Sequence, residues 1–342
     1  MRAIVVTRYL PVDDPECFVE IELPTPEPHG HDLLVRVRAV SVNPVDTQMR
    51  TPRSEIVGAP LILGWDAAGV VEAIGEAVTL FRPGDEVYYA GSIDRAGSNS
   101  EYQLVDERIV GPKPRRLDFA QAAAMPLTTL TAWEGLFERL GIAPDPAANV
   151  NRVLLVIGGA GGVGSLTIQL AKRLAGLRVV ATASRPESVA WTRELGADLS
   201  IDPHQPFRPQ LATAGLDTVN SIYCANATAQ HLDQMADVIA PQGKICLIAG
   251  TRGERPLNFG QFHDKSVTSA WELMFNRPLY QTVDMQAQHD LLAEASRLFD
   301  AGVLRTTLTE RLGSLSVERL RQAHARLETG AMIGKLVLDG LA

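Results

Sequence analysis

The sequence predicts an α/β protein with a β-rich first part and a doubly wound parallel sheet further along the chain. An unbroken apolar run at residues 153–157 leads directly into a glycine-rich loop at 158–164, and leucines at helical spacing follow. From residue 151 onward, strand-like and helix-like segments alternate, which is typical of a parallel sheet. The residues before about 115 have mostly strand-like patterns instead.

Length and composition limit the possible classes of protein. A chain of 342 residues is too long for one ordinary core and fits two domains. The net charge of −8 disfavours binding to nucleic acid or to an anionic membrane. Because no apolar run has the length of a signal-peptide core or a membrane span, we expect a cytoplasmic protein. The three cysteines are scattered, so neither a disulfide framework nor a zinc knuckle is expected.

The first part of the chain contains several strand signals. Apolar and basic residues alternate over 34–40, which predicts a half-buried strand, and 64–75 is rich in glycine and valine. A Pro-Gly-Asp turn at 83–85 precedes a strand at 86–89. Helix-favouring sequence then runs from Phe119 to about residue 140.

The second part alternates between strands and helices. Pro186 suits the first position of a helix because its missing N–H costs nothing there, and Gly196 suits a left-handed cap at the end of that helix. A turn at 241–243 precedes one of the later strands. Beyond the strand at 153–157, strands are expected at residues 178–183, 217–223, 244–249 and 335–338.

The glycine loop has the pattern of a dinucleotide-binding turn. Gly159 would allow the tight turn, Gly161 would let the backbone approach a pyrophosphate, and Gly164 would let the helix pack closely on the strand. The N–H groups of the first helical turn, at Gly162 and Val163, would meet the phosphates. A merely flexible turn is the alternative, but the strand before the loop and the helix after it favour cofactor binding.

The end of the second strand indicates which cofactor is bound. Ser184 lies twenty residues after Gly164, where an acidic residue would select NAD, and Arg185 follows it. A hydroxyl and a guanidinium suit a 2′-phosphate, because arginine binds phosphate through two parallel N–H groups. We therefore predict NADPH rather than NAD; a solvated surface arginine is the alternative interpretation.

With these residues in view, the chain resembles the medium-chain dehydrogenase/reductase superfamily over nearly its full length. Within it, the chain looks like the zinc-free quinone oxidoreductase group, and most like the branch called zinc-type alcohol dehydrogenase-like. The matching motifs are NPVD at 43–46, GWDAAG at 64–69, PGDEV at 83–87, MPL at 125–127, the glycine loop, ASRPE at 183–187, WELMF at 271–275 and GKLVL at 334–338.

The resemblance implies an architecture and an assembly. It predicts a GroES-like catalytic domain at residues 1–125, a Rossmann domain that binds NADPH at 126–270, and a return to the catalytic domain at 271–342. It places the active site in the cleft between the domains, and it implies a homodimer paired through the Rossmann domains.

The resemblance also identifies where a catalytic zinc would be bound. Alcohol dehydrogenases bind it with a cysteine, a histidine and a second cysteine, and the matching positions here hold Asn43, Trp65 and Leu127. None of these side chains is a normal zinc ligand, and the four-cysteine structural lobe is also missing. We therefore expect no metal.

Without zinc, the favoured reaction changes. Alcohol oxidation depends on a Lewis acid to acidify the hydroxyl, whereas a conjugated acceptor spreads the incoming charge by itself. We predict that hydride passes from NADPH to quinones or α,β-unsaturated carbonyls, both small-molecule substrates. A zinc-dependent alcohol dehydrogenase and a non-catalytic nucleotide-binding protein are the alternatives.

Three side chains are candidates for the chemistry. The amide of Asn43 could donate to an oxyanion or position a ribose hydroxyl, or it could be a buried turn-former before Pro44. Asp46 is either a structural loop carboxylate or part of a proton relay, and Tyr89 either packs in a wall or donates a proton.

The remaining candidates line the substrate pocket or contact the cofactor. Trp65 and Trp133 would offer flat apolar surfaces, with a plain core position as the alternative for Trp133. The resemblance places Phe275 in a segment that closes the pocket, and interdomain packing is the alternative for it. Gly250 follows a strand at the edge where ligands bind in open α/β sheets. Lys335 belongs to the family's terminal Gly-Lys pair, which implies that it reaches a cofactor phosphate; a surface lysine is the alternative.

Overall fold

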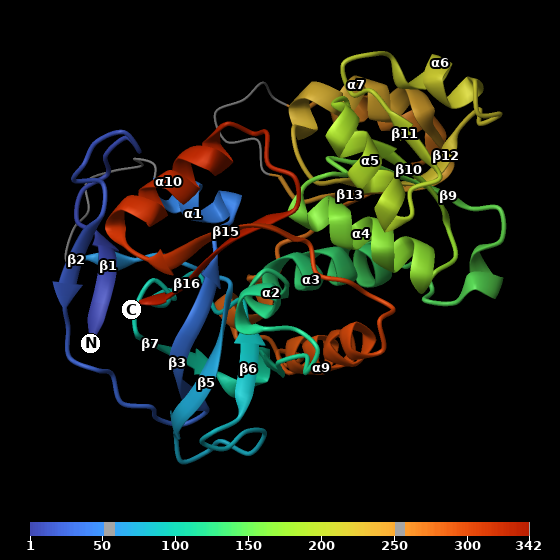
Figure 1. The fold of residues 1–342 in the computed structure, drawn as a ribbon. Helices are drawn as coiled ribbons and strands as arrows, with labels where there is room; N and C mark the ends of the chain where they lie inside the picture. Colours follow the sequence, from blue (N-terminus) through green and yellow to red (C-terminus); the bar gives the residue numbers. More distant parts are fainter. Residues whose placement is uncertain (51–58, 250–256, 342) are drawn as a thin grey trace. The chain divides into compact units, whose positions relative to one another are not determined.

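The computed structural model describes residues 1–50, 59–249 and 257–341, which separate into two compact units. The first unit comprises Met1–Leu130 and Phe275–Ala342, and the second comprises Thr131–Met274. The first unit is β-rich and the second contains a parallel sheet, so the predicted fold class is confirmed (Figure 1).

The first unit is built on a seven-stranded sheet with the order β15-β16-β3-β5-β6-β8, in which β7 also pairs with β3. The last strand of the described chain joins this sheet antiparallel to β3, with Leu338 opposite Val40. The sheet strands are β3 (Asp32–Ser41), β5 (Ala67–Ile74), β6 (Glu86–Tyr89), β7 (Tyr102–Asp106), β8 (Val110–Pro112), β15 (Leu308–Leu315) and β16 (Lys335–Leu341). A smaller sheet contains β2 (Val19–Glu22), β1 (Arg2–Val6) and β4 (Leu61–Ile62).

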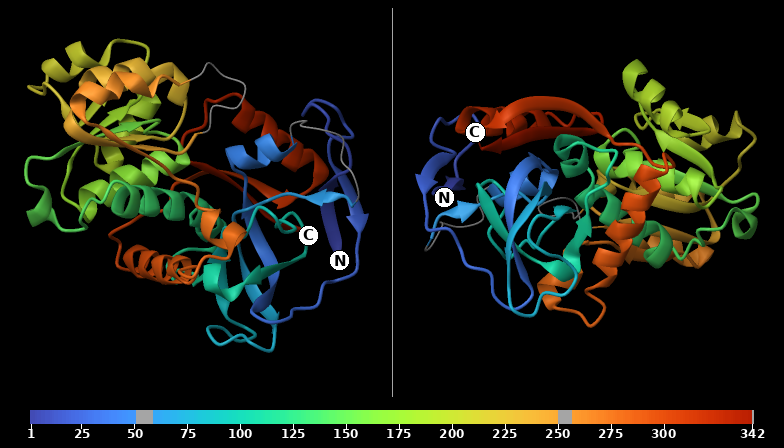
Figure 2. Two further views of the ribbon diagram at one scale, coloured as in Figure 1. Left: turned by 180° about the vertical axis from the view of Figure 1, so that it is seen from behind. Right: turned by 60° about the horizontal axis from the view of Figure 1, so that its bottom comes forward.

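Helices cover the sheets of the first unit. In Figure 1 and in the left view of Figure 2, α10 lies beside α1, and Arg50 Nε of α1 donates to His324 Nδ1 of α10 at 3.4 Å. The helices of this unit are α1 (Pro44–Arg50), η1 (Glu107–Ile109), α2 (Phe119–Ala123), the start of α3 (Pro126–Trp133), α8 (Asn276–Tyr280), α9 (Ala287–Asp300) and α10 (Val317–Glu328).

The helix-favouring sequence from Phe119 to about residue 140 forms three helices and not one continuous helix. It consists of α2, α3 and a π-helix, η2 (Glu134–Arg139), with a break at Ala124 and Met125. The break has a local cause, because Pro126 disfavours helical backbone at the preceding residue and provides no N–H to the helix.

The second unit contains six parallel strands in the order β11-β10-β9-β12-β13-β14. The strands are β9 (Val153–Ile157), β10 (Arg178–Thr182), β11 (Leu199–Ile201), β12 (Val219–Cys224), β13 (Ile239–Leu247) and β14 (Thr268–Trp271). All of β9 is buried, as its unbroken apolar run predicted. β10 and β11, which follow β9 in the chain, lie on one side of it, whereas the later strands β12, β13 and β14 lie on the other side. The strand order therefore reverses beside β9.

Helices cover both faces of this sheet. Alternate residues of β9 face an apolar cluster with α6, α7 and η4, whereas α4 and α5 pack against each other elsewhere on the sheet. The helices are η3 (Pro146–Asn149), α4 (Gly162–Arg173), α5 (Pro186–Leu195), α6 (Phe207–Ala212), α7 (Thr228–Val238) and η4 (Phe259–Lys265). No helix within the described ranges has the length and apolar character needed to cross a bilayer.

Two local predictions for the second unit had different outcomes. Gly196 ends α5 with a φ of +116°, which confirms the predicted left-handed cap. The strand expected at 244–249 instead begins at Ile239 and contains the predicted turn. Its pairing with β12 shifts register after Val219, so an irregularity takes up the residues of that turn within the strand.

Candidate functional site

The glycine loop connects β9 to α4 through very close backbone contacts. Gly158 has a φ of +80°, and its N–H donates to Thr182 Oγ1 at 2.9 Å. A Cβ atom on Gly164 would lie 2.2 Å from the carbonyl oxygen of Gly158, a distance that no side chain tolerates. The start of α4 therefore approaches the end of β9 as closely as it does only because residue 164 is glycine.

The other face of the loop has room for a ligand. A Cβ atom on Gly161 would have only the Gly158 oxygen nearby, at 3.6 Å, and Gly161 caps α4 without a side-chain hydrogen bond. The first N–H groups of a helix, here at Gly162 and Val163, have no acceptor within the helix. These N–H groups and the positive end of the helix dipole fit the phosphates of a dinucleotide.

The end of β10 places the predicted specificity residues at the same edge of the sheet. β10 is parallel to β9, and Ser184 and Arg185 follow it directly. Ser184 is exposed, and the Arg185 side chain is about 42% exposed with its Nε 3.5 Å from Glu187 Oε1. The structure therefore brings the glycine loop, Ser184 and Arg185 to one edge.

A further residue at this edge was missed by the sequence analysis. Asn226 follows β12, and a Cβ atom on Gly158 would lie 2.8 Å from its Oδ1 atom. The residue lies where the strand order reverses, which is the usual ligand position in open α/β sheets. Its position just beyond the strand predicted at 217–223 could have indicated this residue from the sequence.

Gly250, which was also predicted at this edge, lies outside the described residues.

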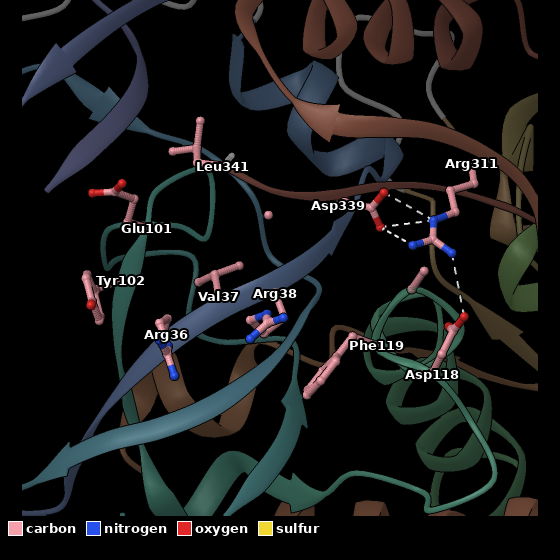
Figure 3. Close-up of a pocket in the computed structure, with 12 residues that line it drawn as sticks. Arg36, Val37, Arg38, Glu101, Tyr102, Asp118, Phe119, Arg311, Asp339 and Leu341 are labelled. Carbon is pink, nitrogen blue, oxygen red and sulfur yellow. Dashed lines mark hydrogen bonds and ion pairs between the residues drawn. The ribbon is translucent and has the colours of Figure 1, made fainter. Parts of the chain in front are cut away.

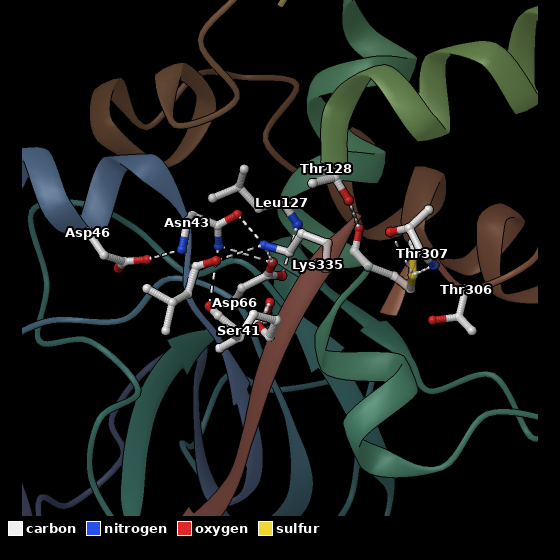
Figure 4. A network of polar contacts seen from close by, with 12 residues as sticks. Ser41, Asn43, Asp46, Asp66, Leu127, Thr128, Thr306, Thr307 and Lys335 are labelled. Carbon is white, nitrogen blue, oxygen red and sulfur yellow. Dashed lines mark hydrogen bonds and ion pairs between the residues drawn. The ribbon is translucent and has the colours of Figure 1, made fainter. Parts of the chain in front are cut away.

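The first unit contains a buried polar network centred on Asp66 (Figure 4). Asp66 Oδ2 accepts a hydrogen bond from Asn43 Nδ2 at 3.1 Å and lies 3.2 Å from Lys335 Nζ. Asp66 Oδ1 accepts from the backbone N–H of Leu127 at 3.1 Å. One carboxylate thus connects four segments that are far apart in the sequence.

Lys335 is a central member of this network. Its ammonium donates to the carbonyl oxygen of Val42 at 3.2 Å and to Asn43 Oδ1, and it forms the ion pair with Asp66. These three acceptors match the three N–H groups of an ammonium. We therefore assign Lys335 to this network, not to the cofactor phosphate that the resemblance implied.

The same network uses the side chain of Asn43. Its amide nitrogen donates to Asp66 and, at 3.3 Å, to the carbonyl oxygen of Ser41, while its oxygen accepts from Lys335. Because both amide N–H groups already have acceptors, the direct donation to an oxyanion considered for Asn43 would require one of these bonds to break.

Asp46 lies beside the network and is only partly satisfied. Its Oδ2 atom accepts from the backbone N–H of Asn43 at 2.5 Å. Its buried Oδ1 atom has no hydrogen-bond partner in the described part of the chain. Burial raises the pKa of Asp46 to about 7, although the N–H groups of Asn43 and Gly64 and the Lys335 ammonium act in the opposite direction. Burial also raises the pKa of Asp66, against the opposing effect of Lys335.

The predicted aromatic residues fall into two groups. Trp65 and Phe275 pack edge to face in the first unit, with ring centroids 6.4 Å apart, and Trp65 Nε1 donates to the carbonyl oxygen of Ser92. Trp133 lies in the second unit, where it packs on Phe137. Tyr89 is buried in the first unit, where burial raises its pKa, and its hydroxyl has no partner among the described residues.

The three positions that would bind zinc lie around Asp66. Asn43 and Leu127 both donate to its carboxylate, and Trp65 precedes it in the chain. An amide, an indole and an aliphatic side chain do not form a zinc site. Across residues 1–50, 59–249 and 257–341, no group of three or more histidine, cysteine, aspartate or glutamate residues could hold a metal. Zinc therefore does not fit these three positions.

The first unit also has a surface pocket of about 590 Å³ (Figure 3). Arg311 pairs there with Asp339 at 2.7 Å, and the Arg38 guanidinium lies over the ring of Phe119, 5.5 Å from its centroid. None of the predicted site residues lines this pocket. We therefore do not place the reaction in it.

Both units match families of dehydrogenases. Residues 29–115 match the family model of the alcohol dehydrogenase GroES-like domain, and residues 162–288 match that of the zinc-binding dehydrogenases. The chain belongs to the medium-chain dehydrogenase/reductase superfamily, in its zinc-type alcohol dehydrogenase-like branch.

Individual relatives cover the full chain. A zinc-type alcohol dehydrogenase-like protein of Staphylococcus epidermidis is 40% identical over 339 residues, which is 99% of each chain. An NADPH-dependent alkenal/one oxidoreductase of Arabidopsis thaliana is 39% identical over 99% of this chain and 79% of its own length. A solved Rhizobium etli structure, assigned as a zinc-dependent alcohol dehydrogenase, is 47% identical with a TM-score of 0.94, over 100% of this chain and 98% of that one.

Proposed function

We propose that this oxidoreductase uses NADPH, works without zinc, and reduces quinones or α,β-unsaturated carbonyls. The observation that carries the proposal is the set of residues around Asp66. Asn43, Trp65 and Leu127 hold the three ligand positions, and Lys335 supplies the positive charge there. The Arabidopsis relative, an NADPH-dependent alkenal/one oxidoreductase, supports this class of acceptor.

The chemistry of the acceptor explains why zinc is dispensable. Oxidising a simple alcohol requires removal of its hydroxyl proton, and a Lewis acid contributes several kcal/mol to that step. A conjugated carbonyl takes up the developing charge in its own π system, so hydrogen bonds and correct orientation suffice. The residues of this chain are suited to the reduction of a conjugated carbonyl.

Residues of the second unit would bind the cofactor. The N–H groups of Gly162 and Val163 would hold the pyrophosphate, with Gly161 allowing close approach. Ser184 and Arg185 would hold the 2′-phosphate. NADPH, when bound, supplies the hydride. Asn226 lies at the same edge and would help to orient the cofactor.

Residues of the first unit would prepare the acceptor side. The Asp66 network fixes the backbone around Asn43 and thereby the position of Asp46. Trp65 and Phe275 provide apolar surface that excludes water, and Tyr89 retains its hydroxyl proton.

We also propose that the protein is a cytoplasmic homodimer. β14 is the last strand of its sheet, and Trp271 and Leu273 beside it are 50% and 52% exposed. An open strand edge with exposed apolar side chains is suited to pairing with a second copy. Sedimentation equilibrium measures this directly, and a monomer at micromolar concentration would contradict it.

Replacing Arg185 by alanine is expected to raise the KM for NADPH by about 10-fold or more, because a hydrogen bond to a charged group contributes about 1.5–3 kcal/mol. The KM for NADH should change little, since NADH has no 2′-phosphate. Arg178→Ala is the matched control, because Arg178 lies at the opposite end of β10, the strand that Arg185 follows. Equal changes for both cofactors in Arg185→Ala would contradict the assignment.

The proposed function is tested by following NADPH oxidation with quinones, enones and simple saturated aldehydes. We expect turnover with the conjugated acceptors and little with the saturated ones. Turnover confined to saturated aldehydes would contradict the proposal.

A further inference from the structure

The buried network in the first unit contains two carboxyl groups and one ammonium. Asp46, Asp66 and Lys335 are 1%, 0% and 4% exposed. If both carboxyls were ionised, the group would carry a net charge of −1 away from water, which is costly. One proton on either carboxyl makes the group neutral. The geometry therefore indicates that this network holds a proton in addition to those of the lysine.

The hydrogen bonds indicate which carboxyl holds it. Asp66 accepts from two N–H groups and pairs with the ammonium, and all of these contacts favour its ionised form. Asp46 accepts the Asn43 N–H on Oδ2, and the Gly64 N–H acts on the same carboxyl more weakly. Its Oδ1 atom has no hydrogen-bond partner within the described chain. The charged groups that act on Asp46 are Lys335 on β16 and Asp66 before β5. The proton thus belongs on Oδ1 of Asp46.

We propose that Asp46 donates the proton that completes reduction of the acceptor, and that Lys335 is a positioning residue that keeps Asp66 ionised and the proton on Asp46. This inference rests on the proposed function. When hydride adds to the β-carbon of an enone, an enolate forms, and the O–H bond of Asp46 breaks as the proton passes to it. The Asp46 carboxylate then takes a proton from water. With a quinone, the proton ends on a hydroquinone oxygen.

The proposal predicts a pH profile. Burial raises the pKa of Asp46 to about 7, so the protonated fraction falls as the pH rises through that value. A proton donor must be protonated to act, and kcat should therefore decline above about pH 7. Below that pH the carboxyl is protonated and the rate should level off.

Asp46→Asn is the discriminating variant. The asparagine keeps an oxygen for the Asn43 N–H but has no proton to release at neutral pH. Its kcat should fall by about 100-fold or more, because a positioned acid contributes 10²–10⁴-fold, and the decline above pH 7 should vanish. Asp85→Asn is the matched control: Asp85 also accepts one backbone N–H, from Arg82 at 2.9 Å, but its side chain is 35% exposed. Its activity should be unchanged.

An infrared measurement tests the location of the proton without any turnover. In the cofactor-free protein at pH 6, an Asp46-dependent band from the C=O stretch of a protonated carboxyl should be present, lost in Asp46→Asn and kept in Asp85→Asn. It adds to a constant signal from Glu272, a carboxyl whose pKa burial raises to about 9. If no band depends on Asp46, the assigned proton is wrong. If the band is present but Asp46→Asn turns over normally, Asp46 is not the donor. If the band is present and the wild type reduces no acceptor, the proposed function fails and proton donation fails with it, whereas the location of the proton stands.

Discussion

Replacing Lys335 by methionine is expected to lower the free energy of unfolding by about 3–5 kcal/mol, because it leaves a buried carboxylate without its partner. Asp66 is fully buried, and Lys335 is the cation that the structure places against it, at 3.2 Å. The methionine keeps most of the side-chain volume, so the loss would come from the charge and not from a cavity. Chemical denaturation at pH 7 measures this change.

Two further variants identify the cause. Lys172→Met removes an ion pair with Asp198 in which both side chains are 34% exposed, and it should cost no more than about 1 kcal/mol. Adding Asp66→Asn to Lys335→Met removes the uncompensated charge and should recover part of the lost stability. If Lys335→Met cost as little as Lys172→Met, the ion pair with Asp66 would not be buried as the structure has it.

Replacing Gly164 by alanine is expected to destabilise the second unit by about 1–3 kcal/mol and to abolish measurable NADPH binding. The added methyl group would lie 2.2 Å from the Gly158 oxygen, so α4 has to move away from β9. That movement displaces the N–H groups that we assign to the pyrophosphate. Thermal unfolding and titration of NADPH fluorescence measure the two effects.

Gly161→Ala separates the effect on stability from the effect on NADPH binding. Its methyl group would have only the Gly158 oxygen nearby, at 3.6 Å, and the backbone φ of −72° suits alanine. The melting temperature should therefore change little, while affinity for NADPH should fall because the methyl group occupies the surface that we assign to the pyrophosphate. A Gly164→Ala variant with wild-type stability and affinity would contradict the close approach.

The features that could be predicted from the sequence depend on local patterns. The apolar run of β9, the glycine loop and the start of α4 are adjacent in the chain, so their order alone defines the turn. The cap at Gly196 likewise depends on one residue. The break before Pro126 was not predicted, although its cause is equally local, because proline acts on its immediate neighbour.

The features that could not be predicted depend on contacts between distant segments. Lys335 lies 292 residues from Asn43, and no local pattern indicates that its ammonium bonds to that side chain. The two uses of Lys335, in a buried network or at a cofactor phosphate, differ only in tertiary packing. The contacts of Asp66 are equally non-local, because its two oxygens accept hydrogen bonds from Asn43, before α1, and from Leu127, at the start of α3.

The most direct test of the account is the activity of the protein after metal removal. The protein is dialysed against a strong chelator, its zinc content is measured, and its rates of NADPH-dependent enone reduction and of ethanol oxidation with NADP⁺ are compared with those of untreated protein. We predict far less than one zinc per chain, undiminished enone reduction and no significant ethanol oxidation. On this account, hydride transfer depends on a conjugated acceptor and not on a metal. That dependence would be contradicted if chelation abolished enone reduction and added zinc restored it, or if the protein oxidised ethanol efficiently.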